Sequence, residues 1–181
     1  MTAKNKFSNV SMNGRMAYII MCCEKMLITK YPSENWKLIS QKMWNATSED
    51  WGTWTYNYNM IIPDVLLSYN LYSSEDFSDV LNEKEFYQLK CLYKNYSTPD
   101  SNENGLFQSI INAPFEFAMI YEGTEIGDGR ESLNFIVNTE QLLLSNNIVL
   151  PDYTKVSFSS FKEKNGWGNN FDGTNLSIIL N

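Results

Sequence analysis

The feature that most constrains the fold is an apolar segment near the N-terminus, between Met12 and Leu27. Its apolar side chains recur mostly at the three- and four-residue steps of an α-helix. They are Met12, Met16, Ile19, Ile20, Cys23 and Leu27, and the other face adds Ala17, Tyr18, Met21 and Cys22. A helix that is apolar almost all the way round is stable only when it is covered by other elements. We therefore expect a central helix that begins near Ser11 and ends before Pro32.

The helical pattern continues to about residue 148. Asn82 is expected to cap one of the later helices, and Pro114 is expected to kink another. The expected segments are 33–44, 48–61, 63–69, 82–96, 106–121 and 131–145. The sequence thus predicts six to seven helices within residues 11–148.

The period of the pattern changes after Pro151. Val156 and Phe158 alternate with polar residues, as do Leu176 and Ile178, and alternation is typical of strands. A glycine-punctuated loop joins these two stretches. The predicted fold is mainly α: a single domain, residues 1–181, with a small two-stranded β element in the C-terminal segment 153–181.

The composition excludes several classes of function. The chain has no histidine, so Ser-His-Asp and Cys-His catalysis and histidine metal sites are excluded. It has 14 basic and 21 acidic residues and a net charge of -7, which argues against nucleic-acid binding through neutralisation of phosphates. An odd number of cysteines, 3 in all, is not a disulfide framework. With no apolar leader and no long apolar run, these features predict a cytoplasmic protein that does not span a membrane.

Three groups of residues could carry chemistry, and each has a simpler interpretation. The glycine segment 123–129 follows a helix and carries carboxylates, unlike a phosphate-binding loop. The carboxylates near it could serve acid–base catalysis or simply be solvated; they are Glu122, Glu125, Asp128 and Glu131. A calcium loop at Asn170, Asp172 and Asn175 lacks the distal glutamate of an EF-hand. We expect no catalytic residue, cofactor or metal, and keep an enzyme using the Glu122–Glu131 carboxylates as an alternative.

Two other groups could bind a partner. The tryptophans between residues 36 and 54 either pack helices together or form an exposed aromatic anchor; they are Trp36, Trp44, Trp51 and Trp54. The acidic stretch 75–85 is either a solvated surface or a patch that steers a basic partner. On charge density alone, the candidate partner-binding residues are Asp76, Asp79, Glu83 and Glu85.

Three sequence pieces, taken in order, carry a family resemblance. The first is Asn13-Gly14-Arg15 at the start of the first helix, and the second is the group Trp44, Trp51 and Trp54 followed by Pro63. The third runs from Phe158-Ser159-Ser160 through Asn165-Gly166-Trp167-Gly168 to Phe171-Asp172. This order resembles the immunity proteins of bacterial polymorphic toxin systems, in particular the sixth family of the Imm series.

The resemblance implies a small helical cytoplasmic protein that binds and blocks a cognate toxin domain and is not an enzyme. Under it, Asp76, Asp79, Glu83 and Glu85 become candidate toxin-binding residues, and a basic nuclease domain is one possible toxin. The matching residues Arg15, Trp44, Trp51, Trp54, Trp167 and Asp172 can equally be structural. One such structural role is a buried ion pair between Arg15 and Asp172. The alternative function is a helical interaction module or regulator unrelated to toxins.

Overall fold

The computed structural model describes residues 3–96, 102–121 and 125–181. Within these ranges the chain forms nine α-helices and four short 3-10 helices. The α-helices are α1 (Ala3–Phe7), α2 (Met12–Lys30), α3 (Lys37–Trp44), α4 (Trp51–Asn59), α5 (Pro63–Ser68), α6 (Ser74–Phe77), α7 (Glu83–Lys94), α8 (Asn102–Met119) and α9 (Arg130–Ser145). The 3-10 helices are η1 (Asn45–Thr47), η2 (Tyr153–Val156), η3 (Lys164–Gly166) and η4 (Gly173–Leu176). The mainly helical prediction is confirmed.

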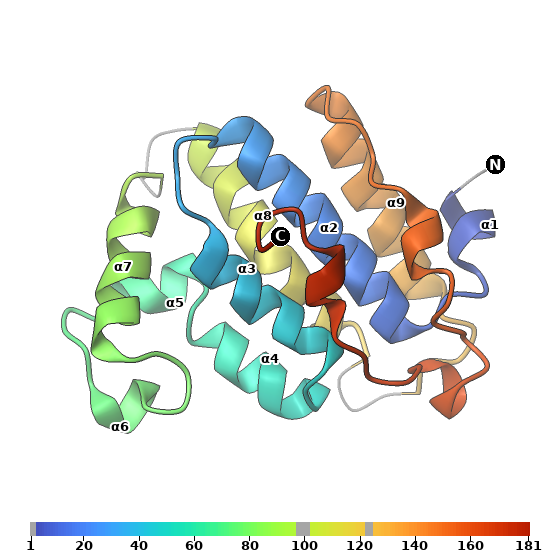
Figure 1. The fold of residues 1–181 in the computed structure, drawn as a ribbon, viewed down its shortest axis with the longest axis horizontal. Helices are drawn as coiled ribbons and strands as arrows, with labels where there is room; N and C mark the ends of the chain where they lie inside the picture. Colours follow the sequence, from blue (N-terminus) through green and yellow to red (C-terminus); the bar gives the residue numbers. More distant parts are fainter. Residues whose placement is uncertain (1–2, 97–101, 122–124) are drawn as a thin grey trace.

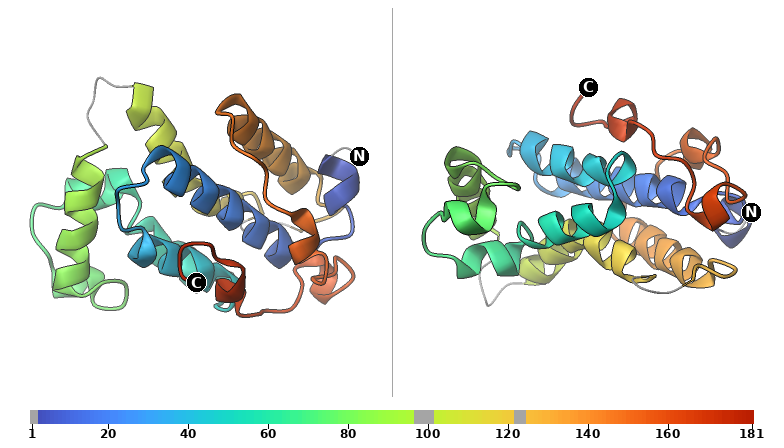
Figure 2. Two further views of the ribbon diagram at one scale, coloured as in Figure 1. Left: turned by 45° about the horizontal axis from the view of Figure 1, so that its top comes forward. Right: turned by 90° about the horizontal axis from the view of Figure 1, so that it is seen from below.

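Helix α2 is the centre of the fold, as its apolar pattern predicts. Ser11 caps it by accepting a hydrogen bond from the backbone N–H of Gly14, and the helix ends at Lys30. From Met12 to Leu27 every residue except Lys25 is buried. Helices α8 and α9 pack along one side of α2, and α3 packs against it from another direction (Figure 1). In the view from below, α2 lies between the layer of α8 and α9 and the C-terminal segment (Figure 2).

Helices α5, α6 and α7 form the end of the molecule farthest from the N-terminus (Figure 1). Asn82 caps α7 in a full capping box, because the Glu85 side chain also accepts from the Asn82 backbone. The predicted cap is therefore confirmed. Beneath it, Phe77 and Phe86 are fully buried, with ring centroids 5.0 Å apart. This end has its own aromatic packing and an acidic surface.

The predicted two-stranded β element is wrong for the described residues. The C-terminal segment 146–181 contains η2, η3 and η4, and the strand-like contact recorded for it is one isolated bridge between Val10 and Ser160. The alternation of apolar and polar residues does not indicate strands here. Ser159 and Ser177 are buried, while Phe158 and Ile178 are exposed. The serine hydroxyls bind polar groups of α2 and its N-cap, so the polar residues face inward. The segment runs over α2 instead of pairing with itself.

The cysteines follow the expected pattern of free thiols. Cys22 and Cys23 are buried on α2, Cys91 is exposed on α7, and all three are unpaired. Burial raises the pKa of both Cys22 and Cys23, which keeps these thiols protonated. Across the described part of the chain, no helix combines the length and the hydropathy that crossing a membrane requires.

Candidate functional site

Arg15 is fully buried and holds three parts of the chain together. Its guanidinium donates to the carbonyl oxygens of Gly129 at 2.8 Å and Phe7 at 3.0 Å, and to the hydroxyl of Ser132 at 2.6 Å. The ring of Phe161 lies over it, 4.9 Å from the guanidinium carbon. Desolvation by burial lowers the pKa of Arg15 to about 10, so the group remains charged at neutral pH. Arg15 thus fastens α1, the start of α9 and the C-terminal segment to α2.

The predicted ion pair between Arg15 and Asp172 does not form. The one salt bridge among the described residues joins Arg130 and Asp128, both exposed. The Asp172 carboxylate instead accepts from the backbone N–H of Thr174 at 3.0 Å and from its hydroxyl at 2.6 Å. Asp172 is the N-cap of η4, and these hydrogen bonds hold its pKa below the usual range. Arg15 is satisfied by neutral oxygens, so it needs no carboxylate.

Glu24 is the buried charge that the sequence reasoning missed. Its carboxylate is fully buried and accepts from the Ser40 hydroxyl at 2.5 Å and the Trp44 indole at 2.8 Å, both on α3. It also accepts from the Ser177 hydroxyl at 2.5 Å and the Ile178 backbone at 2.8 Å. The sequence does contain an indication of it. Glu24 is the one acidic residue of the mostly apolar helix α2, and a buried charge requires partners. Glu24 fastens α3 and the end of the chain to α2.

The first and third of the quoted sequence pieces meet at one seam, where the C-terminal segment meets the start of α2. The backbone of Ser11 donates to Ser159 at 2.9 Å, and that of Asn13 donates to Trp167 at 3.0 Å. The hydroxyls of Ser11 and Ser159 lie 2.6 Å apart. The pieces therefore belong together in space, and their contacts are structural.

Two glycines allow this close approach. At Gly168 φ is +80°, and a Cβ would lie 2.1 Å from the Ser11 hydroxyl oxygen. At Gly173 a Cβ would lie 2.5 Å from the Trp44 ring. A side chain at either position would push the C-terminal segment away from the helices beneath it.

Beside the seam is a groove of about 390 Å³, which we call the tryptophan groove. It is lined by Asn13, Glu49, Asp50, Trp51, Lys164, Trp167, Gly168 and Asn170. The rings of Trp51 and Trp167 meet edge to face, with centroids 5.0 Å apart. The Trp51 indole donates to the Asn13 side-chain oxygen at 2.7 Å, which fixes the ring.

The tryptophans separate into two sets. Trp36, Trp44 and Trp54 are buried, and each indole N–H has an acceptor: Tyr31, Glu24 and Lys42 respectively. For these three, the packing interpretation is confirmed. Trp51 and Trp167 are only partly buried and lie in the groove. They are the aromatic side chains of the quoted motifs that line the groove.

The four candidate acidic residues are not equivalent. Asp76, Asp79 and Glu83 are exposed, on or beside α6 and at the start of α7. Glu85 is partly buried, and its carboxylate is occupied by the capping box. We call the exposed set, extended by Glu75, the acidic edge: Glu75, Asp76, Asp79 and Glu83. It lies beside the buried Phe77, which anchors it to the core.

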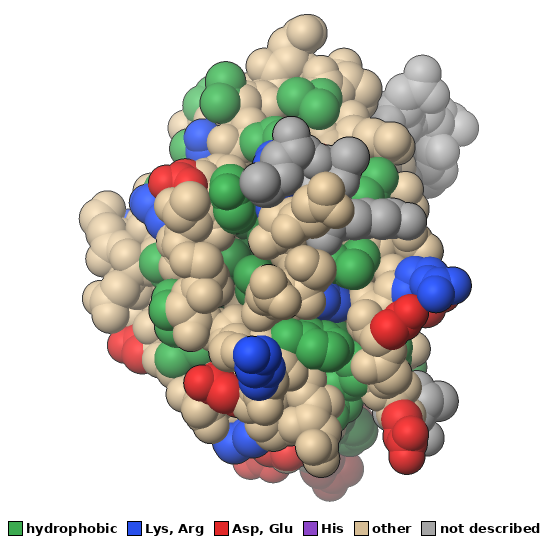
Figure 3. All heavy atoms as spheres, turned by 90° about the vertical axis from the view of Figure 1, so that its right-hand side faces the viewer, with side chains coloured by type: hydrophobic (Ala, Val, Ile, Leu, Met, Phe, Trp, Pro, Cys, Tyr) green, Lys and Arg blue, Asp and Glu red, His purple; other side chains and the backbone are tan. Residues whose placement is uncertain are grey.

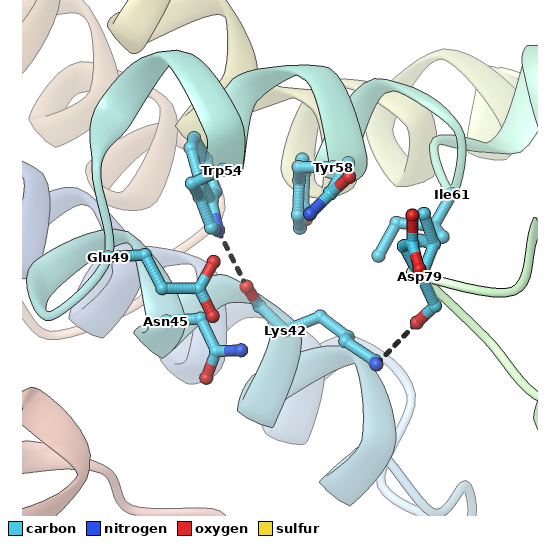
Figure 4. A pocket seen from close by; sticks show the side chains of 9 residues that line it. Lys42, Asn45, Glu49, Trp54, Tyr58, Ile61 and Asp79 are labelled. Atoms are coloured by element: carbon cyan, nitrogen blue, oxygen red, sulfur yellow. Dashed lines mark hydrogen bonds between the residues drawn. The ribbon is translucent and has the colours of Figure 1, made fainter.

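A small pocket lies between the acidic edge and helices α3 and α4 (Figure 4). Its volume is about 50 Å³, enough for a few water molecules and too small for a substrate. The Lys42 ammonium donates to the Val80 carbonyl at 2.6 Å, and the Trp54 indole donates to the Lys42 carbonyl at 2.8 Å (Figure 4). The first bond joins the loop after α6 to α3, and the second joins α4 to α3, so the acidic edge is tied to the helices beside it.

The carboxylates considered for catalysis do not form a pocket in the described residues. Asp128 pairs with Arg130 at the surface, and Glu125 and Glu131 are exposed. Glu122 lies outside the described residues, as do Gly123 and Thr124 of the glycine segment. Among the described residues, no group of three or more acidic or cysteine side chains is placed to hold a metal ion.

Comparison with protein-family models, with curated proteins and with solved structures finds no match for this chain.

Proposed function

We propose that this chain is a cytoplasmic immunity protein that binds a basic toxin domain and blocks it without catalysing a reaction. The observation that carries the proposal is the acidic edge, in which carboxylates are concentrated on a rigid surface. Residues 73–85 hold five carboxylates and one lysine, which is most of the net charge of -7. The resemblance of the quoted motifs to an immunity family supports the same interpretation.

The arrangement of the acidic edge suits a binding role. Asp76 and Asp79 are exposed on either side of Phe77, which is fully buried. The loop that follows is held by Lys42 through the Val80 carbonyl. The charges are thus presented by a fixed backbone, so little conformational entropy is lost when a partner binds.

Charge also speeds association. Concentrated carboxylates steer a positively charged partner and raise its association rate by roughly 10- to 1000-fold at low salt. Among the described residues of the opposite end, acidic and basic side chains are interspersed and form no large patch of either sign (Figure 3). A toxin whose substrate is a nucleic acid needs a basic groove, and the acidic edge complements such a groove.

The test uses the toxin domain encoded next to this chain's gene. The domain is induced in a bacterial host with and without this chain, and survivors are counted. The edge variant is Asp76→Asn/Asp79→Asn/Glu83→Gln, and its control is Glu116→Gln/Glu125→Gln/Glu131→Gln, which removes three exposed carboxylates elsewhere. We expect the chain to restore growth, and the edge variant to associate with the toxin about 10-fold more slowly at low salt. The control should associate almost normally.

Two outcomes would contradict the proposal. Death of cells that contain the folded chain would exclude immunity against that toxin and favour a general interaction module. Equal slowing in both triple variants would show that total charge matters and that the acidic edge has no special role.

A further inference from the structure

We infer that the tryptophan groove is a recognition site for an arginine side chain of a partner protein. The inference depends on the proposed function only in taking the partner to be a protein; its evidence lies in the groove and not in the acidic edge. The groove is assembled from three distant parts of the chain: the start of α2, the start of α4, and residues 164–170.

The aromatic wall of the groove is preorganised. Trp51 donates to the Asn13 side-chain oxygen, and the Asn13 amide donates to the Asn169 carbonyl at 3.2 Å and the Asn170 side chain at 3.3 Å. Asn13 itself is only 3% exposed. On its other side Trp51 contacts the buried Phe117, with centroids 6.2 Å apart. The Trp51 ring is therefore fixed before any ligand arrives, and Trp167 packs edge to face against it, which favours binding.

The rim of the groove is negatively charged. It holds Glu49 and Asp50 against one base, Lys164. Asp50 uses Oδ1 to cap α4 by accepting from Thr53 at 3.0 Å, while Oδ2 has no hydrogen bond from the described residues. Glu49 likewise has no side-chain hydrogen bond or ion pair within the described part of the chain. Asp50 Oδ2 can therefore accept a bond from a ligand, and the Glu49 carboxylate, which points into the neighbouring small pocket (Figure 4), adds negative charge beside the groove.

This combination matches a guanidinium group. Tryptophan faces attract cations more strongly than other rings, and arginine also stacks on them as a plane. The fork of N–H donors on arginine pairs with carboxylate oxygens, whereas the ammonium of lysine is a compact, strongly hydrated point charge. Trp and Arg are also the residue types most enriched in interface hot spots.

The tryptophan groove and the acidic edge lie toward opposite ends of α4 (Figure 1). Glu49 lines both the tryptophan groove and the small pocket beside Asp79. A partner large enough to cover α4 would contact both. The edge would govern the rate of association, and the inserted arginine would govern the rate of dissociation.

The test uses ¹⁹F NMR on the full chain labelled with 5-fluorotryptophan. The probe is the peptide acetyl-Gly-Arg-Gly-amide, and the matched control replaces arginine with citrulline, which has nearly the same shape and no charge. We expect the arginine peptide to shift the resonances of Trp51 and Trp167, while those of the buried Trp36, Trp44 and Trp54 stay in place. Glu49→Gln should weaken binding about 3- to 10-fold, and Glu131→Gln, remote from the groove, should not.

Each other outcome overturns the inference. Equal shifts with the citrulline peptide would mean that the charge is not recognised, and no shift with arginine would mean that the groove is not a cation site. Saturable shifts with a neutral oligosaccharide such as maltotriose, but not with arginine, would assign the groove to sugars.

The variants Trp51→Phe and Trp167→Phe assign the resonances to the two tryptophans. If either variant fails to fold, the comparison of Glu49→Gln with the parent chain still tests the inference. Because no toxin is present, this result is independent of the survival assay.

Discussion

Arg15 and Glu24 are two buried charges on the same helix, and their surroundings differ. They are nine residues apart, which is two and a half turns of α2, so they project from opposite faces roughly 13 Å apart along the axis. Arg15 binds oxygens from α1 and the start of α9, whereas Glu24 binds donors from α3 and from Ser177 and Ile178. Within the described ranges, neither forms a salt bridge. Each charge is solvated by neutral dipoles from segments that would otherwise be held only by apolar packing.

The difference shows how one helix can organise two sides of a fold. Among the described residues, the Nε atom of Arg15 has no hydrogen-bond partner, and the other guanidinium nitrogens donate to two carbonyl oxygens and the Ser132 hydroxyl. The two carboxylate oxygens of Glu24 accept from four donors. We expect loss of the Arg15 interactions to cost more stability, because it removes three hydrogen bonds and a large buried side chain.

The largest effect is expected for Arg15→Met. The substitution keeps much of the apolar stem but removes three hydrogen bonds of the guanidinium, to Phe7, Gly129 and Ser132, from a buried site. The Phe7 and Gly129 carbonyls each keep a backbone donor, Val10 and Leu133 respectively. Loss of three hydrogen bonds to a buried charged group costs about 3–5 kcal/mol. Urea unfolding at pH 7 measures this cost. A loss below about 1 kcal/mol would show that the network contributes little and that packing alone holds this side.

The second effect is expected for Glu24→Gln, which keeps the side-chain shape. The amide oxygen can replace Oε1, which accepts from three donors, but the amide NH2 that replaces Oε2 meets the Ile178 N–H, so we expect a loss of about 2–3 kcal/mol. Hydrogen exchange should quicken at the Ile178 amide, while the Asn13 amide, which bonds to Trp167, keeps its protection. Equally faster hydrogen exchange at both amides would mean that the Arg15 and Glu24 sides of α2 open together. That result would contradict the difference between the two sides.

The smallest effect is expected for Asp172→Asn, at an exposed charge that serves as a comparison with the two buried ones. Hydrogen bonds from the Thr174 hydroxyl and backbone hold the folded pKa of Asp172 below its unfolded value. Its contribution to stability is therefore present above the unfolded pKa, near 4, and is lost as the pH falls through the folded pKa. The variant should unfold nearly as the parent does at pH 3 and slightly more easily at pH 7, in thermal scans at both pH values. The reverse order would contradict the hydrogen-bonded cap.

The helices were predictable because their signals are local. The apolar pattern of α2, the Asn82 cap of α7 and the position of Pro63 at the start of α5 all depend on neighbours within a few residues. The C-terminal segment was not predictable in the same way. Its serines face inward because Ser11 and Glu24, both more than 140 residues away, supply partners for them.

The candidate site was predictable in part. The sequence indicates the groups Asn13-Gly14-Arg15 and Trp167-Gly168 but not that they meet, since a meeting of distant segments leaves no local period. Charge density locates the acidic residues, yet it cannot separate Asp76, which is exposed, from Glu85, which is used as a cap. The tryptophan count likewise cannot separate Trp51 from its buried neighbours.

The donors of Glu24 have a consequence for synthesis of the chain. Ser177 is made 153 residues after Glu24, so α2 emerges from the ribosome long before half of this carboxylate's donors exist. Until then the carboxylate stays hydrated. Bringing Ser177 to Glu24 closes a long loop, and the entropy cost of this closure slows the step. A product cut short before Ser177 would keep an acidic group at the middle of its central helix without its full set of partners. Such a fragment would open more readily and be degraded sooner, so the contacts of Ser177 and Ile178 also discriminate chains that contain these residues from chains that lack them.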